Sequence, residues 1–103
     1  MTIQEMKEFV ERQIAYYTRS IEFDNSQIEY YNREIKRERK RDKELIEAVW
    51  SVGVVTDIDI KIFKPGFVGV ECKKAMKERS YYYRSRKKHI ANLERYKKEL
   101  ANY

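Results

Sequence analysis

Four charged residues in the second half of the sequence have types and spacing that suit phosphodiester hydrolysis. Asp57 and Asp59 alternate with isoleucines on a predicted strand, and Glu71 and Lys73 end the strand predicted to follow it. Metal-assisted hydrolysis of a phosphodiester needs two carboxylates and a basic group that converge at one point. If the chain is a nuclease, these four residues are its candidate catalytic set.

The E-x-K spacing of Glu71 and Lys73, between a strand and a helix, resembles the core of the PD-(D/E)xK nuclease superfamily over residues 44–75. The resemblance implies that Glu71 and a strand aspartate ligate a divalent metal ion, and that Lys73 positions or activates the attacking water. It also implies that Glu44 or Glu47 takes the place of the family's additional helix acid. A reduced nuclease is therefore one alternative function.

Two other residues of reactive type are better explained by packing. His89 lies on an apolar helical stripe, with no serine or acid near it in a triad pattern. Cys72 is of the type that most often serves as a small buried apolar residue. The sequence contains no glycine-rich phosphate loop. We therefore expect no resident metal ion and no cofactor.

The composition favours long helices in one small domain. The 103 residues include 23 Lys or Arg and 17 Asp or Glu, but three Gly, one Pro and one Cys. So few turn-forming residues exclude many-stranded sandwiches and barrels, and a single cysteine favours a reducing compartment. With no run of about 20 apolar residues and no signal-peptide pattern, a cytoplasmic location without a membrane partner is expected.

Heptad spacing predicts one long helix over residues 3–50. Thr2 and Glu5 form a capping-box pattern at its start. Asp24-Asn25-Ser26 offers the alternative of a loop and a fresh N-cap. The two apolar series that repeat at multiples of seven are Ile14, Ile21, Ile28, Ile35 and Val49, and Ile3, Val10, Tyr17, Tyr31 and Leu45.

A further stripe on this helix consists of Phe9, Tyr16, Phe23 and Tyr30, also seven residues apart. Together with the heptad seam, the stripe gives the helix more apolar surface than one partner helix can bury. Two neighbours are therefore predicted.

Beyond the long helix, the pattern predicts a β-hairpin over residues 54–72 and a return helix over 73–102. Ile58, Ile60 and Ile62 alternate with polar residues, and Pro65-Gly66 favours a type II turn. The predicted fold class is mainly α with a small β-hairpin (α+β), in which an antiparallel helical hairpin or coiled coil forms one domain over residues 1–103.

Charged residues at seam positions predict the register of the two helices. If the helices are antiparallel, Asp42 meets Arg79 and Glu38 meets Arg86. Opposite charges at matched positions would fix register and orientation.

This register leaves residues 1–20 without a partner in the chain, so a homodimer, or a second protein, is predicted to cover them. The predicted dimer or partner interface consists of Ile3, Met6, Phe9, Val10, Ile14, Tyr16, Tyr17 and Phe23.

The basic residues concentrate after residue 32, and the predicted register places two basic stretches side by side with tyrosines nearby. Such a belt suits contact with a nucleic acid or an acidic partner, although interspersed acids also allow a solvated helix face. The residues of the predicted belt are Arg33, Lys36, Arg37, Lys40, Arg41, Arg84, Lys87 and Lys88.

The leading hypothesis is a non-enzymatic coiled-coil protein that docks on a macromolecular partner and regulates or inhibits it. The composition resembles that of accessory proteins from phages and mobile elements, which implies an inhibitor of a bacterial nucleic-acid machine such as a CRISPR nuclease. The alternatives are a non-specific nucleic-acid-binding protein and the reduced nuclease.

Overall fold

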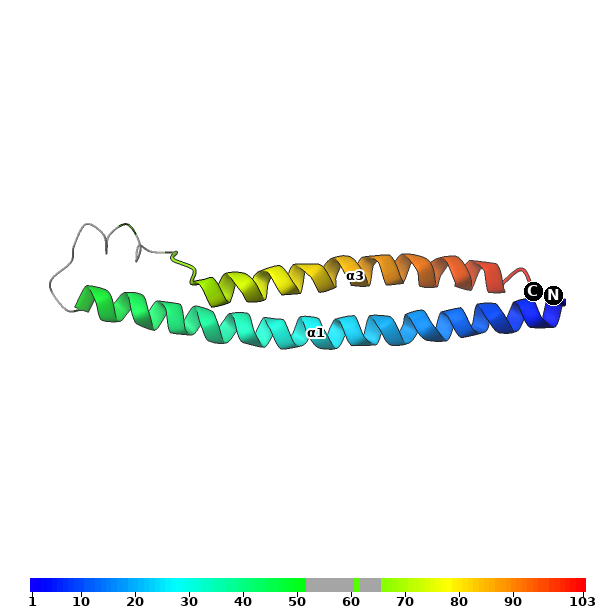
Figure 1. Ribbon diagram of the computed structural model, residues 1–103, viewed down its shortest axis with the longest axis horizontal. Helices are drawn as coiled ribbons and strands as arrows, with labels where there is room; N and C mark the ends of the chain where they lie inside the picture. Colours follow the sequence, from blue (N-terminus) through cyan, green and yellow to red (C-terminus); the bar gives the residue numbers. More distant parts are fainter. Residues whose placement is uncertain (52–60, 62–65) are drawn as a thin grey trace. The chain divides into compact units, whose positions relative to one another are not determined.

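Two long helices account for nearly all of the chain that the structure describes. The computed structural model describes residues 1–51, 61 and 66–103. Helix α1 spans Ile3–Ser51 and helix α3 spans Val70–Leu100 (Figure 1). The described residues contain no β-strand. They agree with a helical hairpin, and their fold class is all-α.

The β-hairpin predicted over residues 54–72 is wrong. Its return strand would include Val70, but α3 begins at Val70, and the Lys73 amide donates to the Gly69 carbonyl at 3.0 Å in its first turn. Lys61, in the other predicted strand, is also helical, and the rest of that strand lies outside the described residues. Val70 is 73% exposed, so the alternation of apolar and polar residues here marks a helix start and not a half-buried strand.

The predicted pairing of Thr2 with Glu5 at the start of α1 is confirmed, with Thr2 as the N-cap. The Glu5 amide donates to Thr2 Oγ1 at 3.1 Å, and the Thr2 hydroxyl donates to Glu5 Oε1 at 3.1 Å. The threonine thus satisfies an amide that has no partner within the helix.

Helix α1 continues without a break through Asp24, Asn25 and Ser26. The Asp24 and Asn25 side chains bond to α3 and not to their own backbone, and the Ser26 hydroxyl donates back to the Glu22 carbonyl at 3.1 Å. Because no side chain in this triplet caps a new helix, the alternative of a second N-terminus is not realised.

The contacts divide the chain into two compact units. The first, which we call the terminal unit, contains residues 1–29, with the first part of α1, and residues 79–103, with the last part of α3. Its helical segments are antiparallel, and the two chain ends lie next to each other (Figure 1). Tyr17 stacks on Tyr96 with ring centroids 5.8 Å apart, and Val10 is 1% exposed.

The second, which we call the middle unit, contains residues 30–78. Its buried core consists of Ile35 from α1 and Cys72 and Ala75 from α3. Tyr31, Val68 and Met76 pack around this core. Cys72 is fully buried, which confirms its predicted role as a small apolar residue.

Candidate functional site

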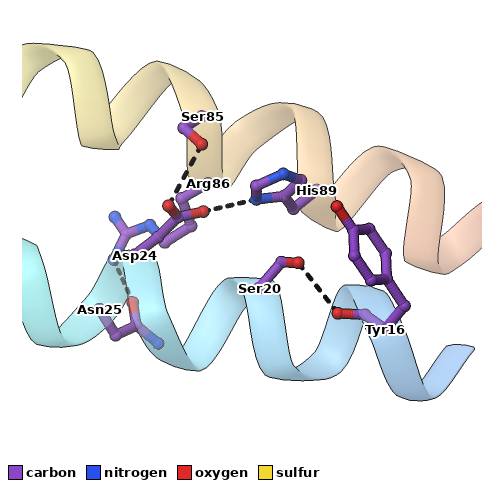
Figure 2. Close-up of polar contacts among 7 residues, drawn as sticks. All are labelled: Tyr16, Ser20, Asp24, Asn25, Ser85, Arg86 and His89. Atoms are coloured by element: carbon purple, nitrogen blue, oxygen red, sulfur yellow. Dashed lines mark hydrogen bonds and ion pairs between the residues drawn. The ribbon is translucent and has the colours of Figure 1, made fainter.

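A buried carboxylate joins the two helices of the terminal unit. Asp24 is 1% exposed and accepts hydrogen bonds from the Ser85 hydroxyl at 3.2 Å and from His89 Nδ1 at 2.6 Å (Figure 2). Beside it, the more exposed Asn25 accepts a hydrogen bond from Arg86 Nη1 at 2.9 Å. Since an ionised carboxylate only accepts, His89 Nδ1 is the donor in this pair.

The order of these bonds does not suit nucleophilic catalysis. In a hydrolase triad the histidine stands between the serine and the acid, so that it removes the hydroxyl proton. Here Asp24 stands between Ser85 and His89, and the Ser85 hydroxyl donates to the carboxylate. The cluster therefore serves to hold the two helices in one register.

An open groove of about 490 Å³ lies over this cluster in the terminal unit. Tyr16 and Phe23 from α1 and Tyr81 and Tyr82 from α3 give it aromatic walls. Phe23 meets Tyr82 edge-to-face, with ring centroids 6.1 Å apart. The other lining residues are Arg19, Ser20, Asp24, Ser85 and His89. The groove thus combines exposed aromatic surface with a polar, internally bonded base.

Three aromatic side chains on α1 form a row that α3 leaves partly uncovered. Phe9, Tyr16 and Phe23 are 41%, 53% and 56% exposed. Their spacing of seven residues places them along one side of the helix, and we call them the aromatic row. This surface corresponds to part of the stripe for which a second neighbour was predicted.

The residues of the predicted partner interface differ in their exposure. Val10 is buried, and Met6, Ile14 and Tyr17 are partly buried, whereas Ile3 and the aromatic row are exposed. Because Tyr17 stacks on Tyr96 of α3, the prediction that residues 1–20 have no partner in the chain is wrong.

The predicted register is also wrong, by about three helical turns. Asp42, expected opposite Arg79, accepts a hydrogen bond from the Gly69 amide at 2.9 Å. Arg86, expected opposite Glu38, bonds to Asn25. The guanidinium groups of Arg79 and Arg86 lie 5.8 Å and 5.1 Å from the ring centroid of Tyr83 on their own helix. Glu38 lines grooves of the middle unit together with Glu71.

Among the described residues, the strand arrangement behind the nuclease resemblance is not observed. Glu71 and Lys73 lie in the first turns of α3, and both are exposed. Glu44 and Glu47 are exposed on α1, while Asp57 and Asp59 lie outside the described residues. In such a nuclease Glu71 and Lys73 would have to end a strand. Because both residues are helical, the resemblance no longer supports a nuclease.

The predicted basic belt is distributed over both units. Arg33, Lys36, Arg37, Lys40 and Arg41 belong to the middle unit, and Arg84, Lys87 and Lys88 belong to the terminal unit; all eight are exposed. The prediction of one continuous belt depended on the predicted register, and the observed register is different. The two basic stretches are therefore treated as two separate surfaces.

Sequence reasoning did not find the Asp24–His89–Ser85 cluster. Both Asp24 and His89 occupy seam positions, where apolar residues are usual, and this shared anomaly was the available signal. Across residues 1–51, 61 and 66–103, no three metal-binding side chains cluster, and neither helix has an apolar stretch long enough to cross a membrane. No protein-family model, curated protein or solved structure matches this chain.

Proposed function

We propose that this chain is a non-enzymatic interaction protein that docks on a macromolecular partner and regulates or inhibits it. The observation that supports this function is the half-exposed aromatic row Phe9, Tyr16 and Phe23, continued across the groove by Tyr81, which is 56% exposed. Aromatic side chains gathered on one face are typical of interaction sites, where they supply much of the binding energy.

The occupant that best fits this face is a helix of a partner protein. A row that repeats every seven residues stays on one side of a helix and offers a seam for a further helix. The groove beside the row supplies an aromatic hollow for side chains of that helix, as in other helix-in-groove complexes. The proposed arrangement is a third helix packed against α1 and α3 in the terminal unit.

The proposed target is a bacterial nucleic-acid machine such as a CRISPR nuclease, and the proposed source is a phage or mobile element. The support for this step is compositional: the sequence is rich in Lys, Glu and Tyr. The expected location of such an inhibitor is the cytoplasm. A homodimer is a further proposal, which now depends mainly on the aromatic row because Val10 is buried within the chain and Tyr17 stacks on Tyr96.

A triple variant tests the role of the aromatic row. Phe9, Tyr16 and Phe23 are changed to Ser, and in the matched control the exposed residues one position earlier, Glu8, Ala15 and Glu22, are changed to Ser. In bacteria that carry a CRISPR nuclease, the wild-type chain and the control should protect an incoming targeted plasmid. The aromatic variant, shown by circular dichroism to remain helical, should not.

Two results would count against the proposal. Full protection by the aromatic variant would exclude the row as the docking face, and no protection by the wild-type chain would exclude this class of target. Light scattering identifies the source of the third helix: a dimeric mass that the aromatic variant loses would assign it to a second copy of the chain.

A further inference from the structure

The middle unit has a second exposed surface, of different chemistry from the aromatic row. Between residues 33 and 41, α1 carries six cations and two acids. Five of the cations occupy one half of the helix circumference, at about 100° per residue. We call these five residues the cationic stripe: Arg33, Lys36, Arg37, Lys40 and Arg41, all exposed.

The acids interspersed with the stripe in the sequence lie along the edge of the stripe that faces α3. Glu34 and Glu38 line a groove with Glu71 and Lys74 of α3, and Asp42 accepts from the Gly69 amide. One ion pair links a stripe residue to these acids, from Arg37 to Glu34, and the Arg37 side chain remains 69% exposed. Arg41 also lines a groove with Glu38 and Asp42, so the acids offset part of the charge of the stripe, while all five of its cations remain exposed.

The side chains within the stripe segment argue against a membrane surface as the partner. Within residues 33–41 the apolar side chain is Ile35, which is 3% exposed in the core of the middle unit. With no exposed apolar residue here to enter a bilayer, the segment is not an amphipathic membrane helix. Residues 33–41 contain no aromatic residue, but Tyr30, 47% exposed, lies one turn before Arg33, so a single strand has to be compared directly with a duplex in the test.

We propose that the cationic stripe binds the phosphodiester backbone of double-helical nucleic acid, without regard to sequence. The stripe extends over about 12 Å of helix, and a duplex presents about seven phosphates over that length. Charge complementarity thus supplies the attraction, and the cations release counterions from the duplex as they bind. This surface is separate from the aromatic row, so the inference does not depend on the proposed docking function.

Salt titration of binding to a fluorescent mixed-sequence DNA duplex tests this inference. For the wild-type chain, the logarithm of the association constant should fall steeply with the logarithm of salt concentration. The change of Arg33, Lys36 and Lys40 to Gln should reduce the slope by about 3, and affinity at 0.1 M salt by roughly 100-fold. Gln has a helix propensity close to that of Lys and Arg, so the variant should stay folded.

The matched control removes the same charge from exposed positions of α3: Arg84, Lys87 and Lys88 are changed to Gln. This control should keep the wild-type slope, because these three cations cover little more than one turn. Equal losses in both variants would overturn the proposal and assign binding to net charge. Tighter binding of a single strand or of polyglutamate than of the duplex would also overturn it.

The variants of the two surfaces separate the two proposals. The aromatic variant should bind duplex DNA as the wild-type chain does, and loss of DNA binding in that variant would contradict the assignment to the cationic stripe. Loss of plasmid protection together with retained DNA binding in the aromatic variant would indicate that the two surfaces act independently.

Discussion

Asp24 shows how one residue can fix the pairing of two helices. Its carboxylate is buried at a seam position, and its bonds to Ser85 and His89 are available only when α3 lies in the observed register. A polar group in a seam costs stability if it loses its partners, so alternative registers are disfavoured. The side chain therefore contributes specificity as well as stability.

The change of Asp24 to Ala should lower the free energy of unfolding by about 2 kcal/mol, because Ser85 and His89 lose their shared acceptor. Urea denaturation monitored by circular dichroism measures this loss. The control is the change of Asn25 to Ala, which removes an exposed bond to Arg86 and should cost less than about 0.5 kcal/mol. Equal costs for the two variants would contradict the role assigned to the buried carboxylate.

A second contact, from Gly69 to Asp42, fixes the position at which α3 begins. A Cβ added at Gly69 would lie 2.6 Å from Asp42 Oδ1, so the carboxylate would have to leave the Gly69 amide. The change of Gly69 to Ala should therefore cost about 1–2 kcal/mol in the wild-type chain and much less when Asp42 is already Ala. Urea denaturation of the double-mutant cycle measures the difference, and strictly additive costs would refute this contact.

At the scale of elements, the long helix was predictable and its partner's register was not. The unbroken heptad phase and the Thr2 cap identify α1 because both signals are local in the sequence. The register is a non-local property, and seam charges such as Asp42 and Arg79 are compatible with several alignments. The observed hydrogen bond to Asp42 comes from the backbone amide of Gly69, and a backbone donor cannot be recognised from the pattern of side chains.

The same reasoning explains why the exposure of the aromatic row could not be predicted. The aromatic row was visible as a stripe, but its exposure depended on which face α3 covers. The predicted strand ending at Glu71 depended on a short alternation that a helix start reproduces, with Gly69 before Val70. Alternation over so few residues does not distinguish the two structures.

A substitution of Val10 tests whether the first part of α1 packs within its own chain. The change of Val10 to Ala should lower stability by about 2 kcal/mol, independent of protein concentration, since the residue is buried within one chain. The change of its neighbour Phe9 to Ala, which affects a residue 41% exposed, should cost less than about 0.5 kcal/mol. A cost for Val10 that grows with protein concentration would instead indicate the intermolecular interface predicted from the sequence.

At the scale of the whole molecule, two surfaces of different chemistry belong to two different units. The terminal unit presents the aromatic row beside a groove, and the middle unit presents the cationic stripe. A protein that blocks a nucleic-acid machine would use the first for a protein helix and the second for the nucleic acid that the machine holds. The two surfaces thus define one proposed activity with two separable parts.

Site-specific photo-crosslinking in bacterial cells tests whether the aromatic row is the docking face for a protein helix. A photoreactive amino acid replaces Tyr16 in the row or, as control, its exposed neighbour Ala15. We expect position 16 to crosslink to a single helical segment of one protein, identified by mass spectrometry, and position 15 not to crosslink. Equal crosslinking at both positions, or none at position 16, would contradict this role of the aromatic row.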